Sequence, residues 1–417
     1  MAELSLEEVT SQVRSWIEQN WDVDLTVAEW WQLLADARYS HPMLPENAGG
    51  LGYNRSLARS VHTTMAEAGV IGPPVGLGTM LAGPTIAAHG TQEQIDRYLP
   101  PILNGQMGWC QLFSEPGAGS DLAGLQTRAE QDGDEWIING QKVWTSGGHY
   151  ADLGILIART DPEQPKHQGI SYFAFDMLQD GVEVRPLVEM TGAALFNEVF
   201  MTDARVHDDA LIGAKGDGWR VANTTLTEER AALGAGGTGV VSFQPGKLGG
   251  MLDKRVGDLV KPGRKGGDRR NFSSTGVSTN YIALAKTLGN IDDPVLRQKL
   301  MTLHTLEQIS KFNTQRARAT AQRTGAEGNI AKLLNAEINR QYREVGNAVI
   351  GAAGMVMGED TPGRGLVQNL TLFSPAPSIY GGTDQVQRNI IGERVLGLPK
   401  EPGPDKSTAF SQLPKNQ

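Results

Sequence analysis

The character of the sequence changes twice along its 417 residues, and this order restricts the fold more than any single motif. Apolar residues recur at helical spacing up to about residue 108. Short runs rich in β-branched and aromatic residues follow, and helical spacing then returns. Helices, strands and again helices predict an α+β protein with an N-terminal helical domain (1–108), a middle antiparallel β domain (109–215), a C-terminal four-helix bundle (216–400) and a tail (401–417).

Individual elements carry their own signals. Thr91 is predicted to be a helix N-cap, because its hydroxyl can accept a hydrogen bond from a free N–H of the first turn. The first predicted helix has an apolar face made of Leu4, Val9, Val13 and Ile17. Later helices are predicted over 218–235, 294–324, 329–350 and 384–396. Strands are predicted over 135–138, 154–158, 170–176, 182–186 and 198–201, and the Asp-Gly, Asn-Gly and Pro turns between them favour antiparallel pairing.

The composition argues against several classes of function. A net charge of −9 and a pI near 5.4 argue against nucleic acid as the main partner. No apolar run is long enough to span a membrane, and the acidic start of the sequence is unlike a signal peptide. One cysteine, Cys110, fits a reducing compartment, so we expect a cytoplasmic protein. The histidines show no metal-ligand spacing, and no metal site is expected.

Several short motifs occur in a fixed order along the sequence. No Gly-x-Gly-x-x-Gly follows a predicted strand, which argues against a Rossmann dinucleotide site. The motifs that are present are Pro45–Gly52, Gly90–Gln94 with Tyr98–Pro100, Ser114–Asp121, Gly140–Ser146, Glu229-Arg230 and Tyr380–Arg388. In this order they resemble the acyl-CoA dehydrogenases over about residues 40–400. The resemblance implies two helical domains flanking a β domain, bound FAD, and dehydrogenation of an acyl-CoA thioester to a 2-enoyl-CoA.

The resemblance also implies which residues contact the ligands. The flavin contacts are Phe113, Ser114, Trp144, Ser146, Thr383 and Gln385, and Ser120 is expected near the acyl-CoA. A flavin presents nitrogen and oxygen atoms along one edge, which suits hydroxyl and N–H donors, while an indole can pack on the ring. The alternative is structural: the Pro-Gly-Ala-Gly sequence forms a tight turn, Trp144 is a core aromatic, and Thr383 is a helix N-cap, which is compatible with a flavin contact.

The catalytic base needs a separate search, because Gly381 stands where many family members carry their glutamate. Removal of a weakly acidic α-proton requires a carboxylate and stabilisation of the enolate oxygen. Gly381 can offer only its backbone N–H to that oxygen. A second branch of the family, similar to isovaleryl- and long-chain-type dehydrogenases, places the glutamate on the helix after the β domain. That resemblance implies Glu229 as the base and Arg230 as an orienting partner.

Helical geometry supports Glu229 independently. This position falls on the apolar stripe of Trp219, Ala222, Leu226 and Leu233. Burial on such a face is expected to raise the pKa of the carboxyl group toward neutrality, which suits a general base. The alternative is a surface glutamate paired one turn away, but neither Thr225 nor Leu233 is basic.

Two further positions suggest a partner chain. In homotetrameric family members a neighbouring subunit contributes an Arg and a Gln to FAD, and the matching positions here are Ala285 and Ala348. A buried pyrophosphate without polar partners is costly. We therefore expect an α2β2 hetero-oligomer in which a homologous subunit supplies the FAD phosphate contacts. Residues Ser374–Tyr380 resemble such divided dehydrogenases of actinobacterial steroid degradation. The alternative is a homo-oligomer in which Lys286 or a basic segment replaces these contacts.

That basic segment spans 236–278 and is rich in glycine. Its basic residues are Lys247, Lys254, Arg255, Lys261, Arg264, Lys265, Arg269 and Arg270. It is interpreted as a long loop that either binds phosphates, of FAD or of CoA, or is solvated.

The leading hypothesis is an FAD-dependent acyl-CoA dehydrogenase with electron-transferring flavoprotein as its acceptor. A bulky substrate such as a steroid side-chain CoA thioester is suggested by analogy, because small residues follow Glu229. One alternative is a flavin monooxygenase or oxidase on the same fold, although a monooxygenase needs no thioester base such as Glu229. The other is a non-catalytic subunit that stabilises an active homologue, which Gly381 favours and Glu229 opposes.

Overall fold

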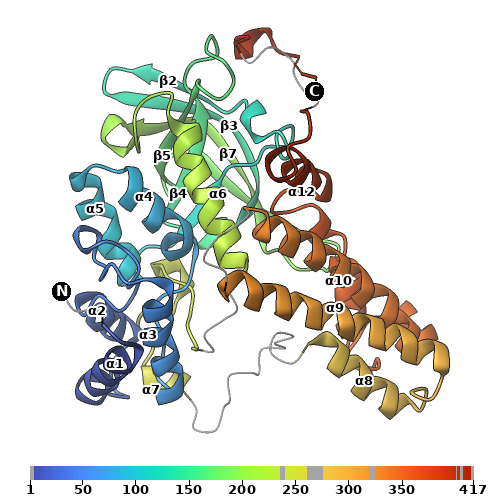
Figure 1. Cartoon of the computed structure of the whole chain (residues 1–417). Helices are drawn as coiled ribbons and strands as arrows, with labels where there is room; N and C mark the ends of the chain where they lie inside the picture. Colours follow the sequence, from blue (N-terminus) through green and yellow to red (C-terminus); the bar gives the residue numbers. More distant parts are fainter. Residues whose placement is uncertain are drawn as a thin grey trace. The chain divides into compact units, whose positions relative to one another are not determined.

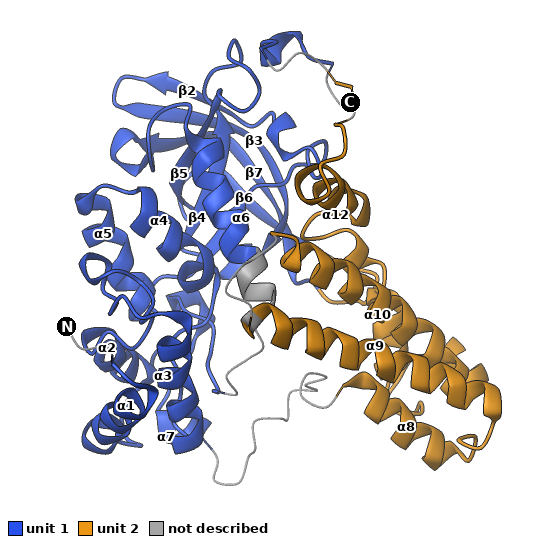
Figure 2. Ribbon diagram, in the orientation of Figure 1, with its two compact units in different colours: residues 1–187, 194–266, 404–417 blue, residues 188–193, 267–403 orange. Residues whose placement is uncertain are grey.

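The computed structural model describes residues 4–234, 240–260, 276–319, 325–400, 402–403 and 407–414, without the side chains of 230–234 and 318. The chain forms two compact units (Figure 2). Unit 1 comprises residues 1–187, 194–266 and 404–417, and unit 2 comprises residues 188–193 and 267–403. Within the described ranges, no helix is both long enough and apolar enough to cross a bilayer.

The N-terminal part of unit 1 is helical (Figure 1). Its helices are α1 (Leu6–Asn20), α2 (Val27–Asp36), α3 (Arg55–Ala68), α4 (Gly83–His89) and α5 (Gln92–Leu103). Thr91 Oγ1 accepts a hydrogen bond from the Gln94 N–H at 3.3 Å, so the predicted N-cap of α5 is confirmed. The predicted apolar face of α1 is buried at Val9, Val13 and Ile17. The prediction was wrong for Leu4, which is 38% exposed because the capping box of Ser5 starts the helix after it.

A seven-stranded sheet follows the helices. Its strands are β1 (Trp109–Leu112), β2 (Arg128–Asp132), β3 (Glu135–Ser146), β4 (Leu153–Arg159), β5 (Ile170–Asp176), β6 (Val182–Leu187) and β7 (Phe196–His207). The strand order is β1-β4-β2-β3-β7-β6, with β5 paired to β4. The pairs β2–β3, β3–β7, β6–β7 and β4–β5 are antiparallel as predicted. Unexpectedly, β1 pairs with β4 in parallel, which the long connection between them permits.

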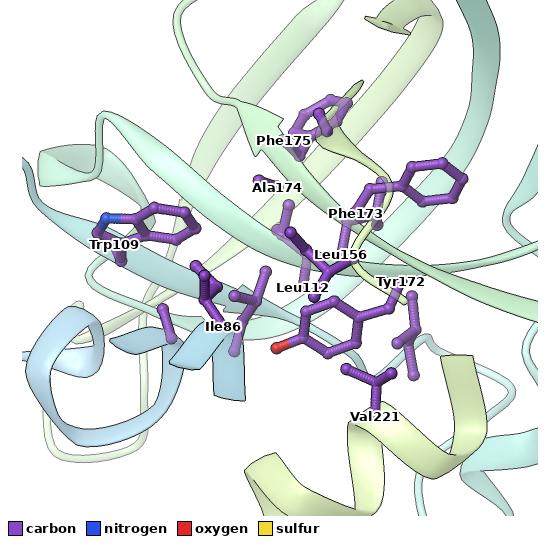
Figure 3. Close-up of a cluster of buried hydrophobic side chains, with 14 of the residues drawn as sticks. Ile86, Trp109, Leu112, Leu156, Tyr172, Phe173, Ala174, Phe175 and Val221 are labelled. Carbon is purple, nitrogen blue, oxygen red and sulfur yellow. The ribbon is translucent and has the colours of Figure 1, made fainter. Parts of the chain in front are cut away.

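The largest core of unit 1 joins the sheet to α4, α5 and α6 (Gly218–Gly234). Figure 3 shows this core around Tyr172 of β5. Ile86 of α4, Leu112 of β1, Leu156 of β4 and Val221 of α6 are fully buried there. Because these side chains come from four elements, the core fixes β1 and the segment after it relative to α6.

The segment 240–260 completes a second core, so of the two alternatives for the basic segment the solvated loop was wrong for these residues. Val256 is fully buried among apolar residues of α1, α2 and α3. The Val27 N–H donates to the Lys254 carbonyl, and the Val256 N–H donates to the Leu25 carbonyl, both at 2.8 Å. The segment contains α7 (Val256–Leu259). Its apolar residues therefore give it a structural role that its glycine content concealed.

The remaining basic residues of that predicted loop are Lys261, Arg264, Lys265, Arg269 and Arg270, and all of them lie outside the described residues.

Unit 2 is helical and has a core of its own. Its helices are α8 (Val277–Leu288), α9 (Pro294–Ala319), α10 (Glu327–Ile350), α11 (Leu366–Phe373) and α12 (Asp384–Ile390). α12 continues as a π-helical turn, Ile391–Val395, which covers most of the predicted helix 384–396. The helix α8 was not predicted, because Gly276 precedes it and gives no side-chain cap.

Candidate active site

A buried ion pair fixes the segment that follows β1. Lys142 of β3 is fully buried, and its Nζ donates to Glu115 Oε1 at 2.9 Å and to the Phe113 carbonyl at 3.0 Å. The Glu115 carboxylate also accepts the backbone N–H groups of Gln126 at 2.7 Å and Thr127 at 2.9 Å. One lysine and one glutamate therefore join the start of the predicted flavin and acyl-CoA segment to residues 126 and 127, which follow that segment.

The charge of this pair is maintained against burial. Burial disfavours the ionised Glu115, but the adjacent Lys142 ammonium and the N–H donors outweigh it and hold the pKa of the carboxyl below its usual range. Glu115 lies in the Ser114–Asp121 motif and Lys142 in the Gly140–Ser146 motif, but neither residue was predicted to have a role. The available signal was a lysine directly before Val143 and Trp144, because a lysine that is buried with such residues needs a partner.

Trp144 projects from a bulge in β3. The register of β3 against β7 shifts between Lys142 and Thr145, and the φ of Trp144 is 61°, a conformation that bulky residues rarely adopt. The indole is 56% exposed and contacts Phe196 edge-on, with 5.8 Å between ring centroids. Trp144 is therefore not a core aromatic. An exposed aromatic face on a strained backbone fits a flat ligand that covers it.

Polar groups lie on both sides of this tryptophan. The Ser114 carbonyl accepts the Val143 N–H at 2.9 Å, which brings Ser114 next to the bulge. Ser146 is exposed at the end of β3. Thr145 is fully buried, and its Oγ1 has no hydrogen-bond partner among the described residues. An unpaired buried hydroxyl beside an exposed indole fits a planar ring with polar edges, which is the shape of a flavin.

Two other predicted residues of unit 1 differ in burial. Phe113 is 4% exposed, and its ring lies edge-on to Tyr172 with 6.0 Å between centroids. Its side chain is therefore part of the core, and a ligand contact at this position is left to its backbone. Ser120 is exposed in the turn after Ala118 and is open to a ligand.

Glu229 lies on α6 beside β1. The buried face of α6 contains Thr225, whose Oγ1 is within 2.9 Å of Thr85 Oγ1 and 3.0 Å of the Tyr172 hydroxyl. Glu229 follows one turn later, is half-buried, and accepts a hydrogen bond of 3.5 Å from Gln111 Nε2. Gln111 lies two residues before Phe113, so unit 1 brings the predicted base close to the predicted flavin segment.

The apolar stripe predicted for α6 is present in part. Ala222 is fully buried, while Trp219 and Leu226 are partly buried at the edge of the core. The side chains of Leu233 and of the predicted orienting residue Arg230 lie outside the described residues.

In unit 2, a turn presents Gly381 in front of α12. Gly381 has a φ of 63°, and its carbonyl accepts Gln387 Nε2 at 2.6 Å. Thr383 Oγ1 accepts the Val386 N–H at 3.2 Å, so the proposed N-cap is confirmed. Gln385 is exposed. The left-handed φ at Gly381 explains why a glycine suits this turn, because a side chain there would be strained.

Asp384 ties this turn to α10. Its carboxylate oxygens accept Lys332 Nζ at 2.9 Å and an Arg340 terminal nitrogen at 3.0 Å, and Arg340 also donates to Ser378 Oγ at 2.7 Å. Burial opposes the charge, but the hydrogen bonds from Lys332 and Arg340 hold the pKa of Asp384 below its usual range. Both ends of the Gly381 turn are thereby anchored to one helix.

The two positions from which a partner chain was predicted differ. Ala348 is exposed on α10, whereas Ala285 is fully buried in the core of unit 2. A side chain at position 285 therefore faces the other helices of unit 2. Of the two positions, only the exposed Ala348 is consistent with a contact to a ligand shared with a partner chain. Lys286, the alternative phosphate contact, is exposed. Among the described residues, no three His, Cys, Asp or Glu side chains gather as metal ligands would.

Comparison with known families decides the identity of the fold. Models of the acyl-CoA dehydrogenase N-terminal, middle and C-terminal domains match residues 1–106, 110–204 and 276–396. The acyl-CoA dehydrogenase IpdE1 of Mycobacterium tuberculosis is 36% identical over 414 residues, which cover 95% of this chain and 98% of that protein. The chain belongs to the acyl-CoA dehydrogenase family. It is an oxidoreductase of a family that depends on FAD, and the resemblance on which the sequence analysis rested is confirmed.

Other relatives extend this result. The acyl-CoA dehydrogenase FadE34 of Mycobacterium tuberculosis is 38% identical over 76% of this chain and 39% of its own length. Among solved structures, the Tcur3481-Tcur3483 steroid acyl-CoA dehydrogenase superposes with a TM-score of 0.69 at 26% identity, covering 95% of this chain and 98% of that one. The ChsE4-ChsE5 complex from Mycobacterium tuberculosis gives 0.67 at 25% identity, covering 96% and 100%. The predicted helix–sheet–helix architecture of an acyl-CoA dehydrogenase is therefore confirmed.

Proposed function

We propose that this acyl-CoA dehydrogenase uses Glu229 as the base that removes the α-proton of its acyl-CoA substrate. The observation that carries the proposal is the position of Glu229 on α6, 3.5 Å from Gln111 on the strand that leads into Phe113 and Ser114. A half-buried carboxylate with an amide donor can take up a proton without moving. Gly381, at the position of the base in many relatives, has no side chain to do so.

Each of the other predicted residues has a role in this proposal. Bound FAD supplies the acceptor for the β-hydride that leaves the substrate as the α-proton goes to the Glu229 carboxylate. In unit 1 the ring would be held by Ser114, Trp144, Ser146 and the backbone of Phe113, and the resemblance adds Thr383 and Gln385 of unit 2. The Gly381 N–H donates to the thioester oxygen, where negative charge develops, and Arg230 orients Glu229. Ser120 contacts the CoA thioester. The roles of Gly381, Thr383, Gln385 and Arg230 rest on the resemblance alone.

The proposal extends to the acyl group of the substrate and to the assembly of the enzyme. We propose a bulky acyl-CoA, of the steroid side-chain type, because a structural neighbour is described as a steroid acyl-CoA dehydrogenase. We also propose an α2β2 assembly with a homologous subunit that contributes FAD phosphate contacts, supported by the exposed Ala348 and by a neighbour described as a complex of two proteins. Electron-transferring flavoprotein is the proposed acceptor, and the cytoplasm is the proposed compartment.

The test of the base is Glu229→Gln, with Glu228→Gln as the matched control on the same helix. With the proposed homologous subunit present, enoyl-CoA formation is measured with an artificial electron acceptor, and FAD content is measured by absorbance. The Glu229 variant is expected to lose about 10²–10⁴-fold in turnover while it retains FAD, because the amide cannot accept the proton. The control is expected to keep wild-type turnover. Undiminished turnover in the Glu229 variant would reject Glu229 as the base.

The test of the assembly is to produce this chain alone and measure bound flavin and oligomeric state. We expect less than one FAD per chain when this chain is produced alone, and full FAD occupancy when the homologous subunit is added. A fully loaded, active homotetramer would reject the divided site and support the alternative in which Lys286 replaces the missing contact. A panel of short, long, branched and steroid acyl-CoA thioesters then tests the substrate class.

A further inference from the structure

A segment beyond the family's C-terminal domain packs onto the middle domain. The C-terminal domain model ends at residue 396, yet residues 407–414 lie in unit 1 against the loop that follows β4. The Phe410 N–H donates to the Gln164 carbonyl and the Ser411 N–H to the Pro162 carbonyl, both at 2.9 Å. Ala409 forms an antiparallel bridge with Pro165. These backbone bonds fix the register of the segment on the loop.

The side chain of Phe410 covers an arginine. Its ring is 9% exposed and lies with its centroid 3.6 Å from Arg159 Cζ, a cation–π contact at close range. Arg159 is itself 4% exposed, and its Nε has no hydrogen-bond partner among the described residues. Burial lowers the pKa of Arg159 to about 10, so the guanidinium stays charged at neutral pH. The aromatic face therefore helps to stabilise a buried charge whose Nε is without a hydrogen-bond partner among the described residues.

Arg159 in turn holds the turn that contains Ser120. One terminal nitrogen donates to the Ala123 carbonyl at 2.6 Å and to the Leu125 carbonyl at 3.3 Å, and the other donates to the Lys166 carbonyl at 2.6 Å. Lys166 Nζ pairs with Asp121, the residue after Ser120, at 2.7 Å. The turn is thus held from β4 and from the loop that carries the 407–414 segment.

We propose that residues 407–414 act as a strap that locks Arg159 and, through it, positions the Ser120–Leu125 turn for the CoA thioester. The ligand named here rests on the proposed function, whereas the link from Phe410 to the turn rests on the contacts alone. Phe410 and Arg159 are positioning residues in this proposal, since neither touches the reacting atoms. Loss of the ring exposes the guanidinium to water and weakens its hold on the Ala123 and Leu125 carbonyls.

The test compares Phe410→Ala with two other variants of the full-length, FAD-loaded chain. Phe410→Tyr keeps the aromatic face, and Gln412→Ala removes an exposed side chain of the same strap. Amide hydrogen exchange of residues 119–127 is followed by mass spectrometry, and binding of coenzyme A alone by calorimetry. Phe410→Ala is expected to raise exchange in this turn and the dissociation constant of CoA about tenfold each. The tyrosine variant and the control are expected to match wild type, with FAD content and the turnover of saturated enzyme unchanged throughout.

Two results would overturn the strap. Unchanged exchange at 119–127, while exchange at 410–413 rises, means that the segment is released without loosening the turn. Unchanged CoA affinity despite faster exchange means that the strap does not act on ligand binding. A wild-type chain that binds no CoA thioester would instead count against the proposed function, and the exchange data would still decide the structural link.

Discussion

The two compact units hold their predicted ligand-contact segments by different means. In unit 1, Lys142 is fully buried and pairs with Glu115, which is 9% exposed. In unit 2, Asp384 pairs with Lys332 and with Arg340, whose side chains are 14% and 31% exposed. The first pair is shielded from water, and each charge in it has a single oppositely charged partner among the described residues. The second reaches the surface and shares one carboxylate between two cations.

This difference predicts how each unit responds to damage. A buried charge that loses its partner cannot be rescued by solvent, so the effect of one substitution is large and extends to the fold. A charge with a second partner and nearby water loses only part of its stabilisation. The Phe113–Ser114 segment should therefore behave as an all-or-none element, and the Gly381 turn as a graded one.

The largest expected effect follows from Lys142→Met. Removing the ammonium leaves Glu115 buried without a cation, and the free energy of unfolding is expected to fall by about 3–5 kcal/mol in chemical denaturation. Arg97→Met is the control, since the Arg97–Asp209 pair is exposed and should cost no more than about 1 kcal/mol. Adding Glu115→Gln to the Lys142 variant should restore part of the loss. A loss equal to that of the control would mean that the buried pair does not stabilise unit 1.

The next effect is a difference in acid sensitivity. Burial and the nearby His62 lower the pKa of His41 in unit 1 to about 4. Its folded-state pKa lies below the unfolded value near 6.5, so its contribution is complete above that pH and is lost as the pH falls toward 4. Unit 1 should lose up to about 3 kcal/mol over this window. The lowered pKa of Asp384 in unit 2 acts only below the unfolded aspartate value of about 3.9.

Hydrogen exchange at pH 7 and pH 5 measures this contrast unit by unit. Exchange around residues 41–53 is expected to rise at pH 5 more than exchange around 378–387. His41→Gln should reduce the pH dependence in unit 1, and an equal acid response of both units would contradict the assignment to His41.

The smallest effect is expected from Asp384→Asn. The amide keeps one acceptor for Lys332 or Arg340 but removes the charge, so unit 2 should lose about 2 kcal/mol. The turn around Gly381 should exchange faster, while the Phe113 segment stays protected. A loss as large as that of Lys142→Met would show that the two anchors do not differ in kind.

Much of the fold could be predicted because local signals and tertiary structure agree. Thr91 is both an N-cap by sequence and an N-cap in the structure, and the strand 170–176 was located to the residue. The strand β2 was missed because four of its five residues are exposed and polar, so it lacks a buried pattern. The parallel pairing of β1 with β4 depends on a partner more than forty residues later, which no local window contains.

The candidate site was predictable in its parts but not in its support. Glu229 could be proposed as the base from its position before Arg230 and from helical spacing, and the structure places it beside β1. The exposure of Trp144 could not be predicted, because it results from a register shift between β3 and β7. The burial of Ala285 could not be predicted from a motif comparison either. Such a comparison shows that a polar residue is replaced by alanine, but not which face of the helix the position lies on.

The seating of the 240–260 segment among the first helices has a consequence for biosynthesis. Val256 completes the core formed by Val13 and Trp30, so the amino-terminal bundle stays unfinished until that residue has left the ribosome. At elongation rates of about 5–20 residues per second, the interval between residue 103 and residue 256 lasts roughly 8–30 seconds. During this time the apolar surface that Val256 later covers is open to chaperones on the nascent chain.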